Sequence, residues 1–473
     1  MNATRNPPRL FCINELLCRR GVILVNSILL VGLPSIRGAE ITQVYAFSNY
    51  FNPSTLYEGT NGNYFGTAGG ASNSGIIFQV STAGDFNGVA EFTPPVGLPF
   101  AGGPLVQDSN GSFYGTAPSA GGFGRYGTVY RVANGIVTNL VSFDGTNGAR
   151  PAAGLIRSSD GNYYGTTQYG GASYRSLLGS PLTLPGTIFR ISESGTLTNL
   201  LSFNRTNGAS PAAPLLWGLD GFLYGTTVGG GASGSGTIFR VTTNGALSTL
   251  FTFDGTNGAN PYGGLLQAAD GKFYGTTAHG GVNDFGTVYQ LTTNGIFTML
   301  ASFNGTNGAY PYAGLVRGYD GKLYGTTQSG GLGFDGSNNS GYGTVFGVTT
   351  NGLLTTLGEL NGTNGAHPVT ALVQGKDGIL YGSASFGGSH DNGSIFRVAI
   401  PIEIQATPNA GSALSLTWNA LSGRTYQVQY RIELGSTNWN DLGTTVTATN
   451  GTCSVVDAIE ADARRFYRVS LLP

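Results

Sequence analysis

The sequence predicts an all-β protein, in which a seven-bladed β-propeller is followed by a small β-sandwich. One unit, "PYGGLLQAADGKFYGTT" at Pro261–Thr277, returns seven times with variations. Glycine supplies 79 of the 473 residues and occupies fixed places in each copy, as turns require. Apolar residues at helical spacing are absent beyond the first 40 residues. A period of about 50 residues with several strands per copy is typical of propellers.

An aromatic residue followed by Gly-Thr or Gly-Ser marks each copy. These seven anchors are Phe65, Tyr114, Tyr164, Tyr224, Tyr274, Tyr324 and Tyr381. Four of the six spacings are about 50 residues, and the other two are longer. We expect the repeated tyrosines to pack between blades, although stacking on a sugar is an alternative role for such rings.

Four strands are expected in every copy. In the fifth copy they are strand A (Leu265–Ala269), strand B (Lys272–Thr277), strand C (Gly286–Leu291) and strand D (Ile296–Phe303). Val, Ile, Phe, Tyr and Thr dominate these runs, as strands require. The Asp270-Gly271 dipeptide between A and B predicts a tight hairpin of type I′, in which both central residues have positive φ.

The two ends of the repeat region complement each other. The first strand-like segment, Ile41–Phe47, has the pattern of strand D, whereas the last copy has strands A, B and C but no D. We therefore predict that Ile41–Phe47 pairs with Ser394–Val398. A ring closed in this way leaves no free sheet edge.

Three segments differ in character. Residues 1–39 resemble an export signal, because Arg19-Arg20 precede the apolar run Gly21–Leu33. The general secretory route, the twin-arginine route and a retained membrane anchor all remain open for this leader. Residues 41–399 form the predicted propeller and residues 402–473 the predicted sandwich. We expect an exported protein, extracellular, at the cell surface or periplasmic, without a membrane span in its mature chain.

Charge and cysteine content exclude several function classes. Charged residues make up 10% of the chain, the net charge is −1, and Lys and Arg form no stripe. Nucleic-acid binding is therefore not expected. With Cys12 and Cys18 in the leader, Cys453 remains alone and is expected to be a small residue packed in a strand. Trp418, Tyr426 and Tyr467 are the expected core of the sandwich.

The D–A and B–C loops are predicted to share one face of the ring, with the A–B and C–D turns on the other. Two insertions, Ala172–Pro185 and Leu332–Tyr342, enlarge B–C loops, and long loops on a rigid scaffold commonly carry binding sites. We expect ligands on this face. The candidate binding residues are Tyr174, Arg175, His279, Asp284, Phe334, Asp335, His367 and His390.

Catalytic and metal-binding patterns are weak. None of the three histidines returns in a sister copy, although His367 and His390 could approach each other. Asp144 and Asp254 in D–A loops are replaced by Asn in sister copies, which a turn tolerates and a catalyst does not. The oxygen-rich segment 334–341, "FDGSNNSG", could hold Ca²⁺, but it lacks the spaced acids of a calcium loop. No cofactor is expected.

Two resemblances to known families follow. The pattern "DGxxYGTTxxGG…GTVFRVTTNG" over residues 41 to about 399 resembles the GloVer tandem repeat of cyanobacterial and verrucomicrobial proteins. This resemblance implies an exported, surface-associated propeller of the choice-of-anchor kind with no established activity. The tail "SLTWNALSGRTYQVQYR…FYRVSLLP" resembles fibronectin type III-like modules.

The sequence thus favours an exported, non-catalytic binding or adhesion protein that engages a polysaccharide or a surface protein. A carbohydrate-active enzyme, either a glycosidase or a lyase using loop carboxylates, is one alternative. A structural surface-layer protein is another. The oligomeric state stays open.

Overall fold

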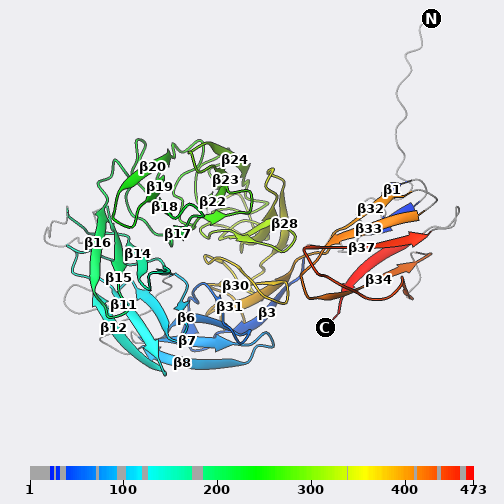
Figure 1. Ribbon diagram of the computed structural model, residues 1–473, viewed down its shortest axis with the longest axis horizontal. Helices are drawn as coiled ribbons and strands as arrows, with labels where there is room; N and C mark the ends of the chain where they lie inside the picture. The colour runs from blue at the N-terminus through cyan, green and yellow to red at the C-terminus, as the bar shows by residue number, and fades with distance from the viewer. Residues whose placement is uncertain are drawn as a thin grey trace, which may run out of the picture. The chain divides into compact units, whose positions relative to one another are not determined.

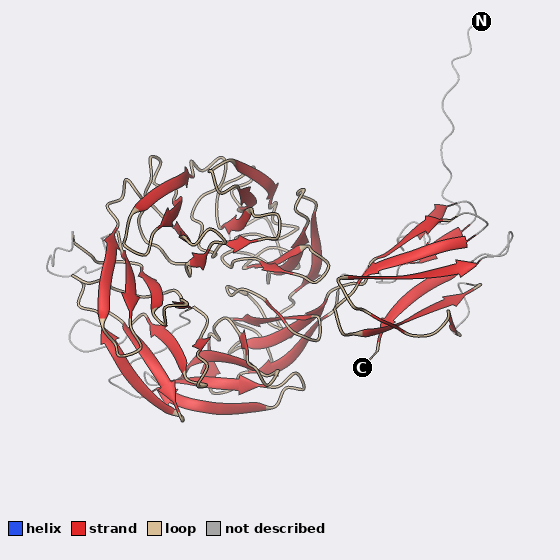
Figure 2. Cartoon of the chain, in the orientation of Figure 1, coloured by secondary structure: helices blue, strands red, loops and turns tan. Residues whose placement is uncertain are grey.

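The computed structural model divides the chain into two compact units, residues 40–399 and a unit formed by residues 1–39 with 400–473. The structure describes residues 22–25, 28–31, 39–70, 74–92, 103–119, 126–172, 185–337, 339–409, 413–433, 438–458 and 465–472. All regular elements in these residues are β-strands, and Figure 2 accordingly shows only strands and loops there. The described residues include no helix with the length and apolar character of a membrane span.

The described strands of residues 40–399 form seven antiparallel sheets, which Figure 1 shows arranged in a ring. The first sheet contains β4 (Tyr50–Phe51), β5 (Tyr57–Glu58), β6 (Tyr64–Gly70), β7 (Gly75–Val80) and β8 (Phe86–Phe92). The second contains β9 (Val106–Gln107), β10 (Phe113–Ala117), β11 (Thr128–Ala133) and β12 (Ile136–Ser142). The third contains β13 (Ile156–Arg157), β14 (Tyr163–Thr167), β15 (Thr187–Ile191) and β16 (Leu197–Ser202).

The remaining sheets repeat this order. The fourth contains β17 (Leu216–Trp217), β18 (Leu223–Thr227), β19 (Thr237–Val241) and β20 (Leu247–Thr252). The fifth contains β21 (Leu266–Gln267), β22 (Phe273–Thr277), β23 (Thr287–Leu291) and β24 (Phe297–Ser302). The sixth contains β25 (Val316–Arg317), β26 (Leu323–Thr327), β27 (Thr344–Val348) and β28 (Leu354–Glu359). The seventh contains β29 (Val373–Gln374), β30 (Ile379–Ala384), β31 (Ser394–Ala399) and β3 (Ile41–Ala46).

The seventh sheet joins the two ends of the ring segment. β3 pairs antiparallel with β31, from Ile41 opposite Val398 to Ala46 opposite Ser394. This pairing confirms the predicted contact between the first strand-like segment and the last repeat. The ring segment therefore begins and ends in one sheet, although 346 residues (47–392) lie between Ala46 and Gly393. The Gly393 carbonyl accepts the backbone N–H of Phe47.

In six of the seven sheets, a side-chain hydroxyl links the sheet to the next one. Thr276 Oγ1 donates to the carbonyl of Ala313 at 2.8 Å, and the same bond recurs around the ring. Sister bonds run from Thr116 to Ala153, Thr166 to Ala213, Thr226 to Gly263 and Thr326 to Thr370. Ser383 in the seventh sheet donates to the carbonyl of Ser54 in the first at 2.9 Å. Buried bonds of this kind fix the angle between neighbouring sheets.

The anchor aromatics lie between sheets, as expected. The rings of Tyr224 and Phe273 in neighbouring sheets have centroids 4.2 Å apart, and those of Tyr381 and Tyr64 are also 4.2 Å apart. Tyr64 and Tyr381 join the seventh sheet to the first. All these rings are almost completely buried, so they stabilise the ring by removing large apolar surfaces from water.

The turn between strands A and B differs from the predicted type I′ geometry. Gly271 has φ 77°, whereas Asp270 keeps an ordinary negative φ. The Gly271 N–H donates to the Ala268 carbonyl, which makes a four-residue turn with a left-handed glycine at its end. The longer turn exists because Asp270 Oδ1 accepts the N–H of Lys272. A two-residue turn with both φ values positive does occur in the second sheet, at Asn134-Gly135.

The other unit contains two sheets besides the β1–β2 hairpin. One sheet has the order β32 (Ile404–Pro408), β33 (Ala413–Asn419), β37 (Thr452–Ala458). In the other, β34 (Thr425–Arg431) pairs with β35 (Asn440–Asp441), β36 (Val446–Thr447) and β38 (Phe466–Leu471). β1 (Val22–Val25) and β2 (Ile28–Val31) form a separate antiparallel pair.

The predicted aromatic core of this unit is confirmed. Trp418, Tyr426 and Tyr467 are each at most 1% exposed and belong to one apolar cluster. Cys453 lies in β37 within the same cluster as a free thiol, and burial raises its pKa. The Tyr426 hydroxyl accepts the backbone N–H of Leu421 at 2.8 Å, which fixes the start of β34 against the preceding loop.

Candidate binding cavity

The D–A and B–C loops are hydrogen-bonded to each other and therefore share one face of the ring, as predicted. In the fifth sheet, Ala259 of the D–A loop and His279 of the B–C loop exchange backbone hydrogen bonds at 2.8 and 3.0 Å. The same bridge joins Ala149 with Tyr169 and Ala366 with Phe386. This pairing makes a rigid rim of loops above the starts of the innermost strands.

The described D–A loops each hold one residue in a left-handed conformation directly before a proline. In five consecutive loops this residue has φ between 53° and 58°. The five are Arg150, Ser210, Asn260, Tyr310 and His367. A non-glycine residue in this region is strained, and such strain is maintained only where surrounding bonds over-determine the backbone. Among these five loops the side chain differs from one to the next, while the backbone geometry does not.

A cavity of about 500 Å³ lies at the centre of the ring on this side. Its wall is formed by the short segments that lead from the D–A loops into the innermost strands, including Ala152, Ala212 and Gly264. The innermost strands can come this close because small residues are placed there. A Cβ atom at Gly263 would lie 2.7 Å from the Ala313 carbonyl carbon and oxygen.

Arg150 is the one charged residue on the described wall of the cavity. Its backbone is held from both sides, because its N–H donates to Tyr126 at 2.6 Å and its carbonyl accepts from Gln168 at 2.9 Å. The guanidinium lies 6.0 Å from the ring centre of Tyr169. Gln168 and Gln328 contribute side chains to the same wall.

Two half-buried tyrosines of the wall lie side by side. The ring centroids of Tyr262 and Tyr312 are 5.0 Å apart and their planes are inclined by 54°. Burial raises the pKa of Tyr262, and the hydroxyls of Tyr312 and Tyr169 add to this, while the charge of Arg150 opposes it. The charge of Arg150 therefore acts on the Tyr262 hydroxyl, and the wall combines aromatic rings with a cation.

None of the sequence-predicted site residues that the structure describes lies on the described wall of the cavity. Tyr174 and Arg175 lie outside the described residues. His279 packs against the ring of Tyr310 at 5.0 Å. Asp284 Oδ1 accepts the N–H of Gly280 at 2.7 Å and so shapes the B–C loop.

The inserted segment Leu332–Tyr342 packs back onto its neighbours. The ring of Phe334 meets Phe285 edge-on at 5.5 Å and covers Gly305. Asp335 is exposed; its Oδ1 accepts the N–H and hydroxyl of Ser337, and these bonds lower its pKa to about 2. The carboxylate thus has a structural role in a tight turn.

The remaining two histidines have separate surroundings. His367 Nδ1 lies 3.0 Å from the carbonyl of Gln328, and its ring meets Phe386 at 5.9 Å. His390 is exposed, with Nδ1 2.8 Å from the hydroxyl of Ser389. Across the described residues no hydrogen bond or ring contact joins these two histidines.

The repeated aspartates are engaged in turns. In the D–A loops, Asp254 Oδ1 accepts the N–H of Asn257 and the hydroxyl of Thr256, and these bonds lower its pKa. Asn204 makes the equivalent bonds in its own loop. Because an amide oxygen serves as well as a carboxylate, a turn explains this position.

The aspartates on the opposite face have a further bond that the sequence did not predict. Asp270 Oδ2 accepts the hydroxyl of the anchor Tyr274 at 2.7 Å. Equivalent bonds join Tyr164 to Asp160, Tyr224 to Asp220, Tyr324 to Asp320 and Tyr381 to Asp377. The carboxylate therefore caps a buried phenol, in addition to shaping the turn.

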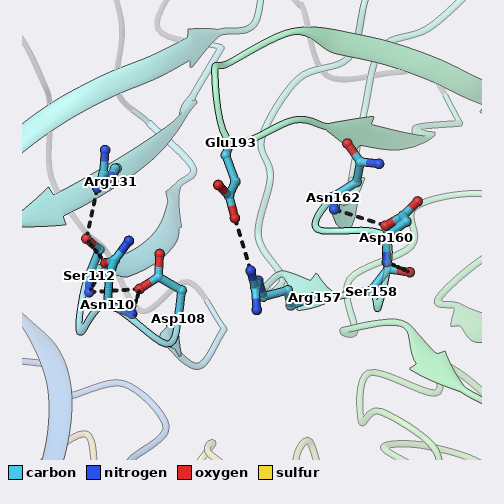
Figure 3. A network of polar contacts seen from close by, with 9 residues as sticks. All are labelled: Asp108, Asn110, Ser112, Arg131, Arg157, Ser158, Asp160, Asn162 and Glu193. Atoms are coloured by element: carbon cyan, nitrogen blue, oxygen red, sulfur yellow. Dashed lines mark hydrogen bonds and ion pairs between the residues drawn. The ribbon is translucent and has the colours of Figure 1, made fainter.

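Figure 3 shows the same face in the second and third sheets. Asp108 Oδ1 accepts the N–H groups of Asn110 and Ser112, and Arg131 donates to the Ser112 hydroxyl at 3.1 Å. Glu193 pairs with Arg157 at 3.0 Å across the A–B and C–D ends of the third sheet. These contacts lie at the turns of the face that does not carry the cavity. Within the described residues, no group of three or more His, Cys, Asp or Glu side chains could hold a metal ion.

A family model described as the Gloeobacter/Verrucomicrobia repeat matches residues 35–181, 179–339 and 216–412. The chain belongs to this repeat family. The matches extend over the whole ring segment, and the tandem arrangement agrees with the repeated sheets described above. No curated protein matches the chain.

Solved structures resemble this member of the repeat family only distantly. A gluconolactonase from Xanthomonas campestris is 13% identical with a TM-score of 0.39, covering 84% of this chain and 96% of its own. A Bacteroides fragilis protein provisionally named a 6-phosphogluconolactonase is 15% identical with a TM-score of 0.42, covering 89% and 100%. A puromycin hydrolase is 10% identical with a TM-score of 0.45, covering 80% and 59%.

Sequence reasoning missed the residues that line the cavity. Arg150, Tyr262 and Tyr312 flank the proline that ends each D–A loop, where the repeat is most regular. A usable signal was present, because the positions on either side of this proline vary among copies that are otherwise alike. Variation at a fixed place in a rigid repeat indicates that the side chain is not required for folding.

Proposed function

We propose that this member of the repeat family is an exported, non-catalytic binding protein, which holds its ligand in the central cavity on the D–A and B–C face. The observation that carries this proposal is the composition of the cavity wall. The wall combines apolar and aromatic surface with a few polar groups, which is the usual make-up of a small-molecule site. Arg150, Tyr262 and Gln168 are representative.

The lack of Asp, Glu and His on the described wall supports binding without glycosidase turnover. A glycosidase needs two carboxylates on either side of the bond it cleaves. The described wall contains no Asp, Glu or His, and the aspartates of the repeats are held in turns. We therefore favour binding over the enzyme alternative, with a polysaccharide or a surface protein as the ligand source.

The architecture we propose for this function is a seven-bladed propeller closed by β3, joined to a fibronectin type III-like sandwich. The bonds from the last sheet to the first, Ser383 to Ser54 and Tyr381 against Tyr64, support closure. The Tyr426 hydroxyl bond to Leu421 supports the second part, since a tyrosine bonded to upstream backbone is a recurrent corner of such sandwiches. Export through the leader of residues 1–39 completes the proposal.

A cavity-blocking variant tests the binding site. Purified protein is applied to a glycan array, and any bound glycan is incubated with the protein and assayed for new reducing ends. Ala212→Trp places a large ring in the cavity wall, whereas Leu353→Trp alters an exposed turn residue on the opposite face. We expect binding without release of reducing ends, lost in Ala212→Trp and kept in Leu353→Trp.

Three results would contradict the proposal. Release of reducing ends would favour the carbohydrate-active enzyme. Undiminished binding by a folded Ala212→Trp variant would place the site outside the cavity. Ordered self-assembly without any ligand would instead favour a surface-layer component.

A further inference from the structure

The cavity contains a cation without a matching anion. Arg150 is exposed, and in the described residues its guanidinium has no ion pair or hydrogen bond and only the ring of Tyr169 beside it. The described wall of the cavity likewise contains no Asp or Glu. This wall therefore offers the guanidinium no carboxylate.

The sister residues of Arg150 are used differently. Asn260 donates to the carbonyl of Val228 at 2.9 Å, and His367 lies 3.0 Å from the carbonyl of Gln328. Tyr310 is buried against neighbouring aromatic rings. Of the five residues at this left-handed position, only Arg150 lies on the described wall of the cavity. The backbone of Arg150 is thus already ordered before binding, so binding costs no further backbone entropy at this residue.

Aromatic and amide groups lie on the same wall. Tyr262 and Tyr312 provide two inclined ring faces, which suit the apolar face of a sugar ring. The side-chain amides of Gln168 and Gln328 make no hydrogen bond to other described residues, so they can bond to ligand hydroxyls. The cavity volume of about 500 Å³ is within the range of pockets for small ligands.

We propose that the cavity recognises a sugar carboxylate, such as the uronic acid of an acidic polysaccharide, with the carboxylate bound by Arg150. This inference rests on the proposed binding function. A guanidinium presents parallel N–H groups that match the two oxygens of a carboxylate. One arginine balances one carboxylate, whereas a phosphate monoester carries up to two negative charges and the described wall has no second cation for it. A sulfate monoester spreads its single charge over three oxygens, so each oxygen is a weaker acceptor than a carboxylate oxygen.

The test uses a defined acidic probe and its neutral counterpart. Isothermal titration calorimetry measures the affinity of the purified protein for a homogalacturonan oligosaccharide and for the same oligosaccharide after reduction of its carboxyl groups. A sulfated oligosaccharide of equal length is the third probe. The variants are Arg150→Gln, Arg150→Lys and, as a matched control, Arg317→Gln, because Arg317 is exposed and lies outside the cavity wall.

We expect the carboxyl-reduced and sulfated probes to bind more weakly than the acidic probe. Arg150→Gln should weaken acidic binding by about 10- to 100-fold, the usual effect of losing a charge-assisted contact. Arg150→Lys should keep part of the affinity, and Arg317→Gln should keep all of it. Equal affinity for acidic and neutral probes, tighter binding of the sulfated probe, or unchanged affinity in Arg150→Gln would overturn the inference.

Failure of this inference is distinguishable from failure of the proposed function. If a neutral glycan binds and Ala212→Trp blocks it, the cavity is a binding site and only the carboxylate assignment is wrong. If a glycan binds and Ala212→Trp leaves that binding intact, the cavity itself is not the site.

Discussion

Tyr274 and Tyr289 form a natural comparison within one sheet. Both rings are fully buried, Tyr274 in β22 and Tyr289 in β23. Tyr289 pairs with Gly275, the residue that follows Tyr274. The Tyr274 hydroxyl donates to Asp270 at 2.7 Å, whereas in the described residues the Tyr289 hydroxyl has no partner. Substitution by Phe removes only a hydroxyl in each case. The difference between the two variants therefore measures the bond to the aspartate.

Tyr274→Phe should lower the free energy of unfolding by about 1–2 kcal/mol, because a hydrogen bond to a charged acceptor is lost and Asp270 is partly rehydrated. Tyr289→Phe should leave stability unchanged or raise it by up to about 1 kcal/mol, because it removes a buried polar group that lacks a partner. Phe already occupies the equivalent positions 189, 239, 346 and 396 in sister sheets. The expected gap between the variants is about 2 kcal/mol.

Urea unfolding of both variants provides the measurement, with hydrogen exchange resolving peptides of the fifth sheet from those of the C-terminal unit. Equal stability of Tyr274→Phe and Tyr289→Phe would refute the reasoning, as would a larger loss in Tyr289→Phe. A companion variant, Asp270→Asn, should keep the turn and lose only part of the bond to Tyr274, so its cost should be smaller than that of Tyr274→Phe.

Three further predictions concern other parts of the chain. Gly263→Ala should lower the free energy of unfolding by about 1–3 kcal/mol, measured by thermal unfolding, because its Cβ would lie 2.7 Å from backbone of the next sheet. The control Gly264→Ala, whose Cβ would have its nearest neighbour at 3.6 Å, should leave stability unchanged. Burial and the bond to Asp220 raise the pKa of Tyr224 to about 12 from 10.0. The raised pKa of the folded state contributes stability that is fully present below pH 10.0 and is lost toward pH 12. The melting temperature should therefore be level below about pH 9 and fall above pH 10, and an equal fall that begins near neutral pH would contradict this prediction. Asp457→Asn should lower the free energy of unfolding of the C-terminal unit by about 3 kcal/mol, because Asp457 is 3% exposed and accepts two short hydrogen bonds from Arg465. Unchanged hydrogen exchange in this unit would contradict the prediction.

Much of the ring could be predicted from the sequence because its signals are local and repeated. The enrichment of Phe273–Thr277 and Thr287–Leu291 in aromatic and β-branched residues, together with the spacing of the anchors, predicts paired strands without knowledge of distant contacts. The link between Ile41–Ala46 and Ser394–Ala399 could also be predicted, because a strand missing at one end of a repeat was present at the other.

Other features depend on geometry that the pattern does not contain. The turn at Asp270-Gly271 is longer than a type I′ turn because the aspartate side chain bonds to Lys272 and Tyr274, and a dipeptide pattern does not reveal those bonds. The cavity residues Arg150 and Tyr262 lie in different sheets, so their proximity depends on the curvature of the whole ring. Sequence patterns placed the D–A and B–C loops on one face, as the structure does, but they favoured residues of the inserted loops over residues of the inner wall.

Closure of the ring is the property on which the central cavity depends, and a disulfide across β3 and β31 tests it most directly. Thr42 and Arg397 face each other in the paired strands, within the separation that a disulfide can bridge. In a cysteine-free background, Thr42→Cys with Arg397→Cys should form an intramolecular bridge, identified by mass spectrometry, and melt at a higher temperature oxidised than reduced. Bridges formed only between molecules, or no bridge at all, would show that the first strand and the last sheet are not joined.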